Sequence, residues 1–62
     1  DYERSLRESI KNTKTVIEQN KIEIDANSGI FGNLSLAERL KKENEGLEFQ
    51  LHEYYRLLDK AQ

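Results

Sequence analysis

The spacing of apolar residues in the first half of the chain alternates between four and three. The series runs Leu6, Ile10, Thr13, Ile17, Asn20 and Ile24. This alternation is the heptad repeat of a coiled coil, abcdefg, in which positions a and d face a partner helix. It places Ile10, Ile17 and Ile24 at a positions and Leu6 at a d position. We therefore predict a helix that packs one stripe against another helix.

The second half of the chain repeats the pattern in a different register. Its series is Ala37, Leu40, Asn44, Leu47, Leu51, Tyr54, Leu58 and Ala61. Continuing the a positions beyond Ile24 leads to positions 31 and 38, whereas the second series has its a positions at Ala37 and Asn44. The two registers do not join, which disfavours one unbroken helix.

A loop is expected between the two series, because Gly29 and Gly32 both lie there and each Gly costs a helix interior about 1 kcal/mol relative to Ala. We expect an all-α chain with a helix over about 3–27, a loop over 28–35 and a helix over about 36–61.

Specific residues are expected to end and begin these helices. Gly29 suits the left-handed conformation that often closes a helix. Ser35 and Glu38 form the S-x-x-E pattern of a capping box, in which each side chain satisfies the other residue's backbone N–H.

An antiparallel hairpin pairs the two series well. Paired residue numbers must then add to a constant, and a sum of 64 centres the turn on Gly32. The predicted seam layers are Ile24 with Leu40, Asn20 with Asn44, Ile17 with Leu47, Thr13 with Leu51, Ile10 with Tyr54, and Leu6 with Leu58. The two asparagines meet, as a device that sets the register would require. A parallel dimer in a longer rod is the alternative, since it would pair Asn44 with its own copy.

The size of the chain makes further association attractive. In a chain of 62 residues, the favourable free energy of apolar burial and the unfavourable free energy of ordering the chain nearly cancel. The sequence has no Cys to form a disulfide or thiolate metal site. Because it also has no Met, we expect residues 1–62 to be a single module from a larger protein.

Composition disfavours several classes of function. Ten basic and twelve acidic residues give a net charge of −2, without the clustered positive charge of a nucleic-acid-binding protein. The sequence shows neither a long apolar run nor a signal-peptide pattern, so we expect no direct membrane insertion and an intracellular, cytoplasmic location.

Candidates for catalysis are few. Glu48 and His52 are four residues apart and could bind a metal with Glu45, but both are expected at solvated positions, where such pairs are ordinary surface contacts. Ser5, Ser9 and Thr13 have no base at a suitable spacing. We expect no enzyme activity, no cofactor and no metal.

The two sides of the seam differ in charge. On the first helix, one side carries a basic row: Arg4, Arg7, Lys11, Lys14 and Lys21. The opposite side, which we call the low-charge face, comprises the g and c positions of both helices. They are Tyr2, Ser5, Ser9, Asn12, Val16, Gln19, Glu23 and Ala26, then Leu36, Arg39, Glu43, Gly46, Gln50, Glu53, Leu57 and Lys60. We expect a partner to contact Tyr2, Val16, Leu36, Gly46, Gln50 and Leu57.

Two heptad helices around a short Gly-containing loop, the second running through Leu40, Leu47, Leu51 and Leu58, resemble the Rho-effector antiparallel coiled coil. That finger occurs in protein-kinase-C-related kinases and Toca-type F-BAR adaptors. The resemblance rests on layout and Leu spacing over almost the whole chain. It implies binding to a Rho-type small GTPase in its GTP state, but no binding residue is carried over. The family's loop often contains Pro, which this chain lacks.

These observations predict a non-catalytic coiled-coil module for protein interaction or oligomerisation. Its partner is expected to be another copy or a different protein, such as a small GTPase.

Overall fold

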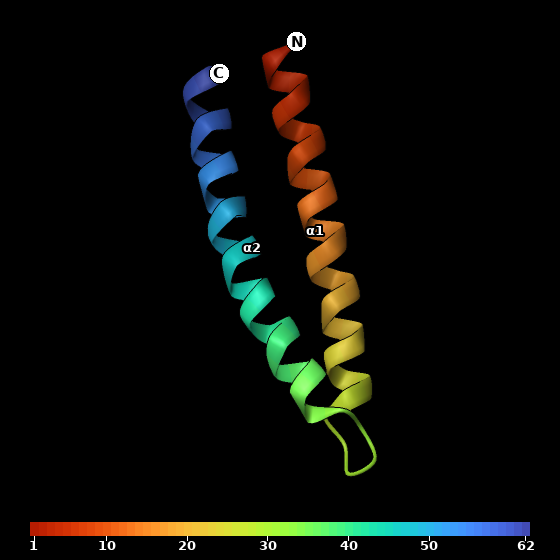
Figure 1. Cartoon of the computed structure of the whole chain (residues 1–62). Helices are drawn as coiled ribbons and strands as arrows, with labels where there is room; N and C mark the ends of the chain where they lie inside the picture. Colours follow the sequence, from red (N-terminus) through yellow and green to blue (C-terminus); the bar gives the residue numbers. More distant parts are fainter.

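The computed structural model describes all 62 residues, and it is an antiparallel pair of helices (Figure 1). Helix α1 spans Tyr2–Asn27 and helix α2 spans Leu34–Ala61. Both chain ends lie at one end of the molecule, and the loop lies at the other. The predicted all-α helical hairpin is confirmed, and a parallel pairing of two unbroken helices does not describe this chain.

Helix α1 begins and ends with side-chain contacts to its own backbone. An Oδ1 atom of Asp1 accepts a hydrogen bond from the Arg4 backbone N–H at 2.8 Å, which caps the N-terminus. At the other end, the Ser28 hydroxyl donates to the carbonyl of Ile24 at 2.5 Å. Between these ends, the heptad stripe faces α2, and its buried residues are Leu6, Ile10, Thr13, Ile17 and Asn20.

The loop is shorter than predicted and uses its glycines differently. It covers residues 28–33, and the expected left-handed Gly29 is wrong because no residue has that conformation. The chain instead turns through a hydrogen bond from the Gly32 N–H to the Gly29 carbonyl at 3.1 Å. Gly32 lies so close to Asn27 that a Cβ atom would overlap the Asn27 backbone. Gly32, rather than Gly29, is therefore the position that requires a glycine.

Helix α2 begins two residues earlier than predicted, and Ser35 is not its cap. Asn33 has an extended backbone, and its Oδ1 accepts from the Leu36 N–H at 3.0 Å. The Asn27 side chain holds Asn33 in place by accepting from its backbone N–H at 3.2 Å. Since Asn33 already occupies the cap, Ser35 falls inside the first turn and the predicted capping box does not form.

The seam residues lie between the helices. Leu6, Ile10, Ile17, Asn20, Leu40 and Asn44 are buried, whereas Ile24, Leu47, Leu51, Tyr54 and Leu58 are half-buried. No side chain is completely buried, since eight of the 62 residues fall in the buried class and none of them is fully sealed from solvent. Neither helix is long and apolar enough to cross a membrane. The hairpin thus has one seam and no closed core.

Candidate interaction surface

The two seam asparagines fix how the helices are aligned. Asn20 Nδ2 donates to Asn44 Oδ1 at 2.8 Å, and Asn44 Nδ2 donates to the Ile17 carbonyl at 3.2 Å. No buried side-chain nitrogen or oxygen lacks a partner. The predicted meeting of Asn20 and Asn44 is confirmed, and it establishes which residues of α1 and α2 share a level on each face.

The low-charge face leaves apolar side chains in solvent. Tyr2 is 61% exposed, Val16 38% and Leu57 36%, while Leu36 is half-buried at the start of α2. Val16 and Leu57 lie on different helices, and no charged residue of α1 separates Tyr2 from Val16 on this face. The face thus carries exposed apolar area on both helices of the hairpin.

Between Glu43 and Glu53, the low-charge face of α2 carries a small residue, Gly46, and an uncharged one, Gln50. Gly46 is exposed, and a Cβ atom added there would meet no atom within 4 Å outside its own helix backbone. Gln50 is exposed and donates from Nε2 to the Tyr54 hydroxyl at 3.0 Å. Nearby, the Arg56 guanidinium pairs with the half-buried Glu53 at 2.6 Å. The Gly at position 46 leaves room for another backbone to approach.

The opposite side of the seam is charged. Lys14 Nζ lies 5.4 Å from the centre of the Tyr55 ring, a cation–π contact that joins α1 to α2. Both ion pairs of the molecule form within a single helix, between Arg7 and Glu3 and between Arg56 and Glu53. The basic row of α1 therefore remains largely solvated.

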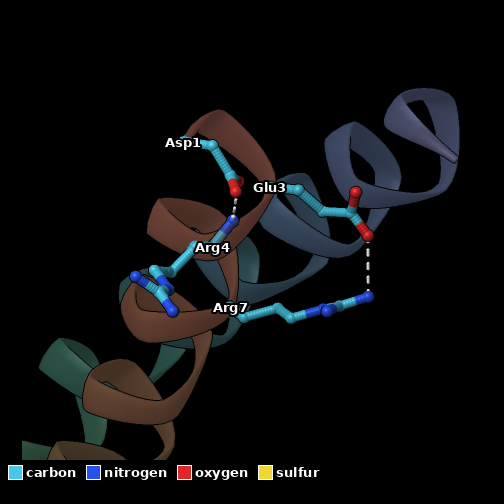
Figure 2. Close-up of polar contacts among 4 residues, drawn as sticks. All are labelled: Asp1, Glu3, Arg4 and Arg7. Carbon is cyan, nitrogen blue, oxygen red and sulfur yellow. Dashed lines mark hydrogen bonds and ion pairs between the residues drawn. The ribbon is translucent and has the colours of Figure 1, made fainter.

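The N-terminus of α1 forms a shallow charged hollow. Figure 2 shows two of its contacts. The Asp1 carboxylate accepts a hydrogen bond from the Arg4 backbone N–H at 2.8 Å, and the Glu3 carboxylate accepts one from the Arg7 guanidinium at 2.7 Å. The residues that line the hollow are all charged: Asp1, Glu3, Arg4, Arg7, Glu8 and Lys11. Because three acidic and three basic side chains line the hollow, and the Asp1 and Glu3 carboxylates already have partners within α1, the hollow favours neither an anion nor a cation.

The residues considered for metal binding or catalysis are not assembled into a site. No three His, Cys, Asp or Glu side chains come together in a way that could hold a metal ion. Glu48 and His52 are exposed on α2. The Thr13 hydroxyl is engaged with the Ser9 carbonyl at 2.7 Å, as is usual for Thr inside a helix.

Sequence reasoning did not single out the loop tip, which we define as Ile30 and Phe31. Their side chains are 95% and 102% exposed. The available signal was a pair of large apolar residues enclosed by Gly29 and Gly32, in the segment between the two heptad series. Leu34, the first residue of α2, is also apolar and is 61% exposed.

In comparisons with known proteins, the chain matches no family model, no curated protein and no solved structure.

Proposed function

We propose that this chain is a non-catalytic protein-interaction module whose low-charge face binds another helical surface. The observation that carries the proposal is the exposure of Tyr2, Val16 and Leu57 on the side where α1 has a single charged residue, Glu23. Apolar side chains gathered on one face of a two-helix unit favour association, because burial against a partner removes them from water.

The arrangement of the molecule supports the same proposal. The seam already uses the a and d residues of both helices, so the exposed apolar side chains cannot be buried within one hairpin. The opposite side carries the basic row and acidic residues of α2, which favour contact with water. A partner that covers the low-charge face would complete a bundle of helices around the half-buried seam residues.

A capture experiment with matched variants tests this function. Val16→Glu with Leu57→Glu changes the net charge by −2 without touching the seam. The control, Lys11→Gln with Lys21→Gln, changes the net charge equally on the opposite side and spares Lys14, which lies over Tyr55. The wild-type chain and both variants are immobilised and exposed to a cell extract. We expect the amount of captured protein to be at least tenfold lower for Val16→Glu with Leu57→Glu than for the wild type, and to be unchanged for the control.

Circular dichroism of both variants should report unchanged helicity, so that a loss of binding is not a loss of folding. If the control loses the captured proteins while the Val16 and Leu57 variant keeps them, the partner contacts the basic row of α1 and the proposed face is wrong.

The two-helix layout favours a second candidate, an effector that binds a Rho-type small GTPase. Such an effector distinguishes the GTP state because only the switch segments of the GTPase differ between nucleotides. We expect at least tenfold tighter binding to a GTPase loaded with a GTP analogue than to its GDP form. A panel of Rho-type GTPases with no nucleotide-dependent binding at high micromolar concentration would eliminate this candidate.

A further inference from the structure

We infer that the loop tip, Ile30 and Phe31, is a contact site for the surface of a zwitterionic lipid bilayer. The inference concerns a different surface from the low-charge face and goes beyond the proposed function. Three observations carry it: the exposure and shape of the tip, the absence of charge around it, and the balance of the charges behind it.

The loop tip is an apolar knob at one end of the hairpin. Figure 1 shows the loop projecting beyond the ends of both helices, and Ile30 and Phe31 are 95% and 102% exposed. The hydrogen bond from the Gly32 N–H to the Gly29 carbonyl closes the turn beneath them. Entry of two large apolar side chains into an apolar medium is favourable, and a loop that is already closed loses little freedom when it binds.

Charged residues are missing around the tip. Residues 26–37 form twelve consecutive positions without a charged side chain, whereas elsewhere no more than four consecutive positions lack one, in a chain that is 35% charged. This difference favours a lipid surface over a pocket on a protein. Charges at the rim of a protein pocket stay in water, whereas a charge that enters a bilayer loses its hydration.

The helix termini show the same lack of charge at the loop end alone. At the end with the chain termini, α1 has the acidic Glu3 in its first turn and α2 has the basic Lys60 in its last turn, as helix dipoles favour. At the loop end, α2 has no acidic residue in its first turn and α1 has no basic residue in its last turn. The charges that would stabilise these helix termini are thus missing next to the tip.

The charges behind the uncharged segment determine which lipid surface it suits. The nearest are acidic: Asp25 lies about 3 Å from the end of α1 and Glu38 about 6 Å from the start of α2, at a rise of about 1.5 Å per residue. Between the Asn20–Asn44 pair and the tip, residues 21–43 carry four acidic and four basic side chains. Anionic lipids would therefore not strengthen the contact, because they attract segments with an excess of positive charge.

The contact is a shallow one. Neither helix is long and apolar enough to cross a membrane, and the expectation of no membrane insertion rests on the lack of a long apolar run. Two side chains that enter the interface need no such run. They bury less apolar surface than a myristoyl chain, whose membrane binding is already marginal and reversible, so we expect binding at millimolar lipid.

Tryptophan emission tests where the contact lies, because the chain has no Trp of its own. Phe31→Trp places a single reporter at the tip, and Phe49→Trp places one at a Phe of α2 that is 71% exposed. With phosphatidylcholine vesicles at millimolar lipid, we expect the emission of Phe31→Trp to shift to shorter wavelength and that of Phe49→Trp to stay unchanged. No shift for Phe31→Trp up to tens of millimolar lipid, or an equal shift for both variants, would overturn the inference.

Co-sedimentation with the same vesicles compares matched variants of the otherwise unlabelled chain. Ile30→Ser with Phe31→Ser removes the tip, whereas Ile22→Ser with Phe49→Ser removes the same two types of side chain from helix positions that are 66% and 71% exposed. We expect the partition coefficient to fall at least tenfold for the first variant and to be unchanged for the second, with equal helicity by circular dichroism. The reverse order would place the contact on the helices and overturn the role of the tip.

A protein partner for the tip is the competing outcome. If the wild-type chain does not bind vesicles, and Ile30→Ser with Phe31→Ser loses proteins that the wild type captures from a membrane-free extract, the tip binds a protein and the inference is overturned.

Lipid charge and salt complete the test. We expect binding to phosphatidylcholine to persist at high salt and not to increase when phosphatidylserine is added. Binding that requires phosphatidylserine and is lost at high salt would show that the basic residues carry it, and would overturn the inference. The Val16→Glu with Leu57→Glu variant keeps the tip and should bind vesicles like the wild type, so failure of this inference is distinguishable from failure of the proposed function.

Discussion

At the scale of single residues, the Asn20–Asn44 pair is the polar centre of an otherwise apolar seam. Asn44 both accepts from Asn20 and donates to the Ile17 carbonyl, so its amide is satisfied on both sides. A one-turn slip of the helices would separate the two amides and leave each buried without its partner. The pair thus stabilises one alignment against its neighbours.

Replacing one asparagine should cost more stability than replacing both. Asn20→Leu removes the donor to Asn44 Oδ1, whereas adding Asn44→Leu removes the buried acceptor as well and increases apolar contact. We expect a coupling free energy of about 1–3 kcal/mol between the two changes, measured by urea denaturation of all four chains at one concentration. Effects that add within about 0.5 kcal/mol would contradict a shared hydrogen bond.

The two loop glycines should respond differently to Ala. At Gly32, the added Cβ would overlap the Asn27 backbone, so the loop must shift at a cost of about 1–3 kcal/mol. At Gly29, the space is open and the backbone is not left-handed, so Ala should be neutral or stabilise by up to about 1 kcal/mol. Thermal unfolding of both variants measures the difference, and equal effects would refute the assigned role of Gly32.

At the scale of the elements, both helices begin with a side-chain cap, Asp1 for α1 and Asn33 for α2, whereas the S-x-x-E pattern predicted Ser35 as the cap of α2. The sequence Asn33-Leu34-Ser35 offers two capping residues two positions apart. Which of the two caps α2 depends on where the loop ends. The hydrogen bond from the Asn33 N–H to the Asn27 side chain holds Asn33 at the end of the loop, so Asn33 is the cap.

The cap of α2 can be tested by replacing each candidate. Asn33→Ala removes the acceptor for the Leu36 N–H and should destabilise the hairpin by about 1 kcal/mol. Ser35→Ala changes a residue inside the helix and should alter stability by less than about 0.5 kcal/mol. If chemical denaturation showed that Ser35→Ala lowers the free energy of unfolding more than Asn33→Ala does, Ser35 would be the cap, as the capping-box pattern predicted.

Gly46 weakens α2 in the isolated hairpin. It lies in mid-helix, exposed and with open space beyond it, so Gly46→Ala should stabilise the folded chain by about 1 kcal/mol. Denaturation at low concentration, where association is weak, measures this gain. A loss of stability would mean that Gly46 already has a close neighbour in the folded state.

At the scale of the whole molecule, one seam between two helices has to stabilise 62 residues. Several seam residues of α2 are only half-buried, and large apolar side chains remain on the low-charge face and at the loop tip. Small single-core chains are marginally stable, and association is a common remedy. Folding and association of this chain should therefore be linked.

This linkage predicts a melting temperature that depends on concentration. If two hairpins unfold together, a tenfold rise in concentration should raise the Tm by roughly 5 °C, given the unfolding entropy of a dimer of this size. The Val16→Glu with Leu57→Glu variant should melt at a lower temperature that does not change with concentration. Differential scanning calorimetry over two decades of concentration provides the measurement, and a constant wild-type Tm would contradict the linkage.

The sequence by itself determined the two helices, the residues of the seam and the alignment of Asn20 with Asn44. These features follow from spacing along the chain, because heptad periodicity places a side chain on one face of a helix whatever surrounds it. The low-charge face followed from the same periodicity, and its role in binding stays a prediction.

Only the tertiary structure decided the cap at Asn33, the need for glycine at position 32, the half-burial of Leu36, the Lys14–Tyr55 contact and the full exposure of the loop tip. Each of these depends on the path by which the loop closes and on the distance between two helices that are remote in sequence. Local spacing contains no information on either quantity, because both are set by packing across the seam and by hydrogen bonds within the turn.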